Sequence, residues 1–147
     1  MLKKLFPLLF AGAAITMAGQ AMAAEHVVKM LNAGIGGAMV FEPAVVNALP
    51  GDTIRYVPTD RGHNAELITG MLPAGAVVTR GAMGKEFFLK VTTQGVYGVK
   101  CAPHYSAGMV GLVKVGAAAN LDAAKAASEK APNFAKRRFA TYFAQNR

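Results

Sequence analysis

The stretch GVYGVKCAPHYSAGMVGLVKV, residues 95–115, is typical of two short apolar strands joined by a compact loop. The loop contains Cys101, the only cysteine of the chain, with His104 three positions later and Met109 five beyond that. A single cysteine excludes an internal disulfide, so the fold must be stabilised by packing alone. In an oxidising compartment an unpaired thiol can form disulfides with other chains or become oxidised. We therefore expect something in this protein to occupy or protect the sulfur.

The residues on either side of this stretch also favour short strands. Apolar and polar residues alternate with period two in KEFFLKV, DTIRYVP and MVGLVKV, and turns rich in glycine and proline separate these runs. Many short strands at such spacing indicate an antiparallel sandwich or barrel. The side chains expected on the buried faces are Ile54, Tyr56, Phe87, Leu89, Val91, Val110 and Leu112.

The first 23 residues are typical of a signal peptide. Lys3 and Lys4 precede an apolar run, and Ala21-Met22-Ala23 forms a cleavage site of small residues. The alternative is an uncleaved membrane anchor, but the run is short for a span of roughly 20 residues and contains Pro7. We predict cleavage after Ala23, export to the periplasm and no membrane anchor.

The composition changes near residue 119, and we place a domain boundary between residues 24–118 and 119–147. The second segment is rich in alanine and lacks β-branched runs, which favours helix. We expect one helix over residues 121–129 with Asn120 as its N-cap, and another over residues 132–144 with Pro132 in its first turn. The apolar face of the second helix would contain Phe134, Arg138, Tyr142, Phe139 and Phe143 and pack on the sandwich. A partly disordered tail is the alternative.

The charge of the chain favours acidic partners. The net charge is +8, and removal of Lys3 and Lys4 would lower it to +6. The absence of a nucleic-acid motif, the few clustered aromatic residues and the predicted export argue against nucleic acid as a partner.

The candidate donor atoms are a thiolate, two imidazoles and a thioether. His63 lies in the loop TDRGHNAE, well before Cys101, and can reach the same end of a sandwich as His104 and Met109. Two histidines, one cysteine and a weak axial methionine are the ligands that blue-copper electron-transfer sites use. We take His26 as structural, and Met30, Met39, Met71 and Met83 as weaker axial candidates because they lie outside this loop.

Other interpretations of the same residues stay open at this point. Cys101 could be packed in the core, and each histidine could be an ordinary surface or core residue. A zinc site would need four firm ligands, or three and an open position for water, and rarely uses a thioether. A cysteine hydrolase would need a base and an orienting residue, for which only Asn64 is near.

The chain resembles the cupredoxins and, within them, the pseudoazurin family. The resemblance rests on MLN, GAMVFEPA, PGDT, PTDRGHN, GVYGVKCAPHY, GMVG and the helical tail. It implies an all-β, eight-stranded Greek-key sandwich with two C-terminal α-helices and one type 1 copper ion bound by His63, Cys101, His104 and Met109. It also implies a monomeric periplasmic shuttle that carries single electrons to a reductase of denitrification, typically the copper nitrite reductase. A copper-sequestering or copper-delivery protein is the alternative function.

The resemblance also suggests roles for the neighbours of the site. Asn64 would tie the two ligand loops together and donate its backbone N–H to the thiolate, and Asn32 would lie beside that network. Pro103 has no N–H to offer to the sulfur.

We expect partners to dock at the exposed edge of His104. The basic side chains that we expect around it belong to Arg61, Arg80 and Lys100. Ala107 replaces a bulky apolar residue of the family pattern, and Ala33 replaces a frequent lysine, so we expect the affinity of this docking surface for partners to differ from that of its relatives.

Overall fold

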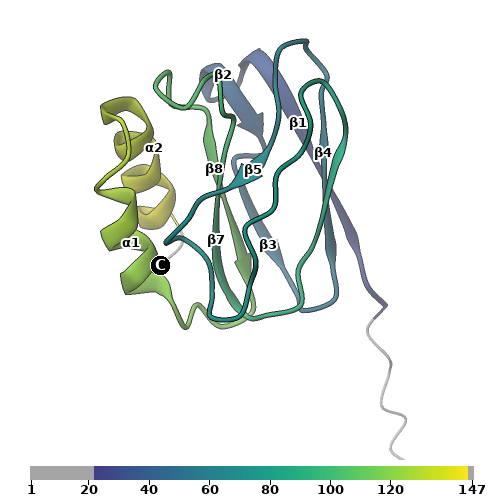
Figure 1. Cartoon of the computed structure of the whole chain (residues 1–147), viewed down its shortest axis with the longest axis vertical. Coiled ribbons are helices and arrows are strands. Elements are labelled where there is room, and N and C mark those ends of the chain that lie inside the picture. The colour runs from purple at the N-terminus through teal and green to yellow at the C-terminus, as the bar shows by residue number, and fades with distance from the viewer. Residues whose placement is uncertain (1–21, 146–147) are drawn as a thin grey trace, which may run out of the picture.

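The computed structural model describes residues 22–145, which form two facing β-sheets with two helices packed against one of them (Figure 1). The strands are β1 Glu25–Gly34, β2 Gly37–Glu42, β3 Val45–Ala48, β4 Thr53–Val57, β5 Glu66–Leu67, β6 Phe87–Lys90, β7 Gly95–Lys100 and β8 Val110–Val115. Their order is β2-β1-β4-β6 in one sheet and β3-β8-β7-β5 in the other. The eight-stranded sandwich that the sequence predicts is therefore confirmed.

The expectation of an antiparallel sandwich was wrong for two strand pairs, which are parallel. β1 runs parallel to β4, with His26 opposite Ile54, and β3 runs parallel to β8, with Val46 opposite Val113. In both pairs the chain visits the other sheet between the two strands, so no tight hairpin forces them to be antiparallel. This topology brings the loops after β4 and β7 to the same end of the sandwich.

The alternating patterns place side chains as predicted. Ile54, Tyr56, Leu89 and Val91 are buried between the sheets, whereas Phe88 of β6 is exposed. β8 is different because both of its faces are covered. Its Val113 and Val115 pack between the sheets, whereas its Val110 and Leu112 pack against the helices.

The helices are α1 Leu121–Ser128 and α2 Asn133–Ala144, close to the predicted ranges, and both pack on the sheet that contains β7 and β8. Phe139 is fully buried there, but Phe134, which we expected on the apolar face, is mostly exposed. Asn120 is the N-cap residue of α1, as predicted, but its side chain makes no capping hydrogen bond. Instead, its Oδ1 accepts from the N–H of Val96 at 2.6 Å and its Nδ2 donates to the carbonyl of Val96 at 2.9 Å. One amide thus satisfies both a donor and an acceptor of β7.

The predicted signal peptide, residues 1–23, lies outside the described residues except for its last two. Among the residues that the structure does describe, no helix is long and apolar enough to span a membrane. The predicted boundary near residue 119 stays a prediction.

A buried carboxylate joins the first strand to the turn before β4. Asp52 accepts hydrogen bonds from the backbone N–H groups of Leu49 and Ala24 at 2.9 and 2.8 Å, and one of its oxygens lies 2.8 Å from His26 Nε2. The N–H of Leu49 contributes most, followed by that of Ala24 and by His26, and together they lower the pKa of Asp52 to about 2. Ionised Asp52 therefore stabilises the start of the sandwich.

We predict that Asp52→Asn lowers the free energy of unfolding at pH 7 and removes part of its pH dependence. Because the pKa is lower in the folded state than the usual 3.8, the stabilisation is complete above about pH 4 and is lost as the pH falls towards 2. Urea unfolding between pH 2 and 7 should show the variant and the parent converging at the acid end. The exposed Asp122→Asn is the control, and a constant difference across the range would contradict the prediction.

Candidate metal centre

Two loops at one end of the sandwich hold the candidate donors. His63 lies in the loop between β4 and β5, Cys101 directly follows β7, and Met109 directly precedes β8. The loop between β7 and β8 is closed by two backbone hydrogen bonds, both 3.0 Å long. The N–H of Cys101 donates to the carbonyl of Met109, and the N–H of Met109 donates to the carbonyl of His104. Gly108 permits the tight return with a φ of 89°, a conformation that other residues rarely adopt.

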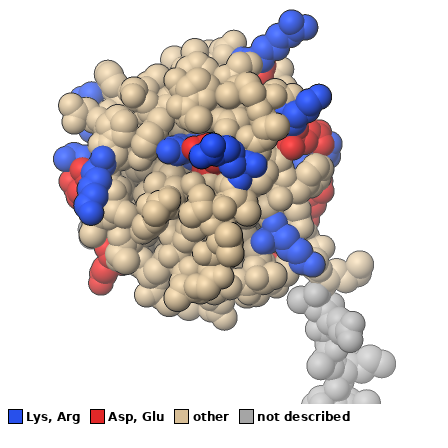
Figure 2. Space-filling model, viewed as in Figure 1, with Lys and Arg blue, Asp and Glu red and all other residues tan. Residues whose placement is uncertain are grey.

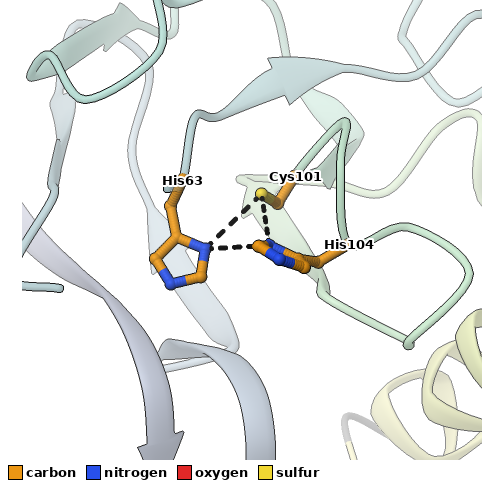
Figure 3. A group of neighbouring side chains, drawn as sticks. All are labelled: His63, Cys101 and His104. Atoms are coloured by element: carbon orange, nitrogen blue, oxygen red, sulfur yellow. Dashed lines mark hydrogen bonds between the residues drawn. The ribbon is translucent and has the colours of Figure 1, made fainter. Parts of the chain in front are cut away.

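Three donor atoms point at one another (Figure 3). Cys101 Sγ lies 3.7 Å from His63 Nδ1 and 3.6 Å from His104 Nδ1, and the two Nδ1 atoms are 3.1 Å apart. Among the described residues, His63, Cys101 and His104 are the one group of three or more His, Cys, Asp or Glu side chains whose ligand atoms lie close enough together to bind one metal ion. His26, which we took as structural, lies apart from it beside Asp52.

Asn32 fixes the orientation of His63. Its Oδ1 lies 2.9 Å from His63 Nε2 and can only accept a hydrogen bond, so Nε2 carries the proton. The Nδ1 of a neutral ring then presents a lone pair to the other donors. Burial, followed by the proximity of His104, lowers the pKa of His63, and Asp60 opposes them only in part. Asn32 on β1 thus prepares the ring to bind a cation.

The environment of Cys101 combines burial with hydrogen-bond donors. Burial, the largest effect, raises the pKa of the fully buried thiol, and hydrogen bonding by the backbone N–H groups of Asn64 and His104 opposes it. The side chain of Asn64 accepts a hydrogen bond from the N–H of Ala102 at 2.8 Å. Asn64 therefore links the two ligand loops, as the family resemblance implies.

The fourth candidate, Met109, is also fully buried and lies in the same apolar cluster as Cys101. Of the rival methionines, Met30 is buried in the same cluster but lies on β1, Met71 is buried in a second cluster, Met39 is half-buried and Met83 is exposed. Among the four candidate ligands, His104 alone has a partly exposed side chain.

The proposed docking residues occupy different environments. Arg61 and Ala107 are exposed, and Arg80 is mostly exposed; Pro103, which we expected beside the thiolate, is exposed as well. Arg80 and Lys100 both form ion pairs with the buried Glu66. Figure 2 shows basic side chains scattered over the face in view, several of them beside acidic ones, with wide uncharged areas between.

Sequence reasoning missed Arg138 as a support of the ligand loop. This α2 residue donates through Nη1 to the carbonyls of Met39 and Gly108, both at 2.7 Å, and through Nη2 to that of Ala38 at 2.8 Å. The guanidinium thereby joins α2, β2 and the loop that ends in Met109. The helical period placed Arg138 on the packed face, but no local signal identified its partners.

We predict that Arg138→Met lowers the free energy of unfolding of the metal-free protein by about 2 kcal/mol, because charged hydrogen bonds to three carbonyls are lost. Urea unfolding measures this effect. The control is Arg137→Met, since the guanidinium of Arg137 lies over the exposed Phe134 ring at 4.7 Å and should contribute under about 1 kcal/mol. Equal effects for the two variants would contradict the prediction.

The donor geometry and chemistry fit a soft metal ion. A point equidistant from the three atoms would lie about 2 Å from each, close to ordinary metal–nitrogen and metal–sulfur bond lengths. A bound cation would also reverse the effect of burial on the thiol, because a coordinating thiol is deprotonated. Two imidazoles and a thiolate with a nearby thioether favour copper over metals that prefer oxygen ligands.

The comparisons with known proteins agree with one another. The family described as copper binding proteins, plastocyanin/azurin family, matches residues 28–116. The pseudoazurin of Paracoccus pantotrophus is 51% identical over 92% of both chains, and a putative pseudoazurin of Rhizobium leguminosarum bv. viciae is 42% identical over 95% of this chain and 92% of the relative. The crystal structure of pseudoazurin from Methylobacterium extorquens AM1 covers 84% of this chain and 99% of its own, with a TM-score of 0.79 and 50% identity.

Proposed function

Because the chain belongs to the pseudoazurins of the plastocyanin/azurin family and is a blue-copper electron-transfer protein and not an enzyme, we propose that it carries single electrons in the periplasm to a terminal reductase. The reductase that we propose is a denitrification enzyme with an acidic docking face, such as a copper nitrite reductase, supplied by an upstream electron donor. The proposal includes removal of residues 1–23 on export and a monomeric mature protein.

The observation that supports this proposal most is the convergence of Cys101 Sγ with two Nδ1 atoms at separations of 3.1–3.7 Å. We assign His63, Cys101, His104 and Met109 as the ligands of one copper ion. When bound, copper supplies a one-electron Cu(II)/Cu(I) couple. The protein holds the thiolate and the imidazole of His63 away from water, while Asn32 and Asn64 restrict the movement of both loops.

The exposure of the ligands indicates where a partner approaches. His63, Cys101 and Met109 are fully buried, whereas His104 is only half-buried, so His104 is the ligand through which a docked protein would exchange an electron with bound copper. Exposed Arg61 lies on the same loop as His63, and exposed Pro103 and Ala107 lie on the same loop as His104. The small apolar side chains give close approach without strong adhesion, which suits brief binding.

We predict that the oxidised, copper-loaded protein is intensely blue to green and bleaches reversibly with a mild reductant. Cys101→Ser should abolish this colour, because the absorption arises from the thiolate–copper bond. Visible absorption spectra of the loaded variants measure it, and His26→Gln, which changes a histidine away from the donors, should keep the colour. A colourless protein that retains copper would instead support the sequestering function.

We predict that electron transfer to an acidic-faced copper nitrite reductase slows as the ionic strength rises, because screening shortens to about 8 Å near physiological salt. Arg61→Gln should lower the second-order rate at low salt roughly two- to fivefold, as expected for one exposed charge pair. Stopped-flow kinetics measure both effects. Lys130→Gln, at the exposed turn between the helices, should leave the rate unchanged, and rates indifferent to salt would contradict the docking proposal.

A further inference from the structure

A buried carboxylate lies between the metal centre and the charged surface. Glu66 of β5 is 6% exposed. The strand register places it opposite Lys100, the residue before Cys101, and a separate bridge places it opposite Arg80. The backbone thus holds one acidic side chain between two basic ones, next to a ligand.

The side chain of Glu66 is fully engaged by these neighbours. Its Oε2 lies 3.0 Å from Arg80 Nε and accepts from Asn64 Nδ2 at 3.3 Å, while its Oε1 lies 3.4 Å from Lys100 Nζ. Asn64 continues the chain of contacts to the N–H of Ala102, beside Cys101. In Figure 2 acidic atoms lie among basic ones over the region of β5.

The charge of Glu66 acts on the metal centre. Its carboxylate accepts from Asn64, whose side chain binds the N–H of Ala102 next to Cys101, and β5 places Glu66 opposite Lys100, the residue before Cys101. A negative charge near the donors favours the more positive Cu(II) over Cu(I) and so lowers the reduction potential. Arg80 and Lys100 act in the opposite sense, and the potential therefore depends on the balance within this ion-pair cluster.

We propose that Glu66 is a positioning residue that lowers the reduction potential of the copper site and holds Arg80 and Lys100 in place for an acidic partner. The second part rests on the proposed docking function, whereas the first does not. Arg80 and Lys100 already pair with Glu66, so a carboxylate of the partner must compete with Glu66 for them. This competition weakens docking at this position. Such competition suits a carrier that must release its partner after each transfer.

The test compares Glu66→Gln with Glu86→Gln in the copper-loaded protein. Both variants remove one negative charge, but Glu86 is exposed and pairs with Arg55 on the other sheet, so solvent screens its charge more strongly than that of buried Glu66. At the midpoint potential of the parent, Glu66→Gln should raise the ratio of reduced to oxidised protein roughly three- to tenfold. Redox titration followed by the blue absorption measures this ratio, and Glu86→Gln should change it much less.

A purely structural role is tested by the sign of a second effect. Arg80→Gln removes a positive charge from the same cluster and should shift the ratio in the opposite direction, and the double variant should return towards the parent. Loss of packing alone cannot produce opposite signs. The proposal is overturned if Glu66→Gln shifts the ratio no more than Glu86→Gln, or if Glu66→Gln and Arg80→Gln shift it in the same direction.

The docking part has its own measurement. At low salt, Glu66→Gln should bind an acidic-faced copper nitrite reductase several-fold more tightly, because the two cations no longer share their charge with Glu66. NMR titration of the reduced protein measures the affinity. If Arg80→Gln and Lys100→Gln leave the affinity unchanged while the potential shifts as expected, then the proposed docking role of these cations fails and the effect of Glu66 on the copper site stands.

Discussion

The hydrogen bond from the N–H of Ala102 to the side chain of Asn64 holds the two halves of the metal centre together. His63 and Cys101 come from loops on opposite sides of this bond, so the distance between their donor atoms depends on it. The Nδ2 of the same amide also bonds the carbonyl of Gly81 at 3.2 Å and so fixes a third segment. A buried amide with both ends satisfied has little freedom to move, which restricts the rearrangement of the site when its charge changes.

The support of the site extends outward in layers of different chemistry. Next to the donors are the amides of Asn32 and Asn64, which are neutral and orient a ring and a loop. Further out are charged groups, with the Glu66 cluster on one side and Arg138 on the other. Neutral groups next to the donors set their geometry, whereas the charges further out would adjust the potential, and Arg138 anchors α2.

Much of the fold could be predicted from local sequence patterns. Period-two alternation identified the buried faces of β4 and β6 because one face of each is open to solvent. It could not describe β8, where helices cover the second face and both sets of positions are apolar. The parallel pairs β1–β4 and β3–β8 were missed because strand direction depends on the connections between sheets and not on side-chain periodicity.

The donor residues were recognisable because their types and spacing are rare in combination. The supporting residues were not, since Glu66, Arg138 and Asn120 act through partners that are distant in sequence. Asn120 illustrates the limit. Its position before a helix indicated a cap, but the tertiary structure used the same amide to hold β7. Local propensity identifies where a polar residue is useful and cannot identify the partner that the fold brings to it.

The enclosure of β8 has a consequence for how such a protein can vary over time. One face of this strand packs against the opposite sheet and the other packs under the helices. Few of its positions can therefore accept a substitution, and the half-buried Lys114 is the main exception. A change of volume at Val113 must be matched inside the sandwich, and one at Leu112 must be matched on α2. Divergence in the helical segment and divergence in β8 are thus coupled, and the strand that follows Met109 should be among the slowest parts of the molecule to drift.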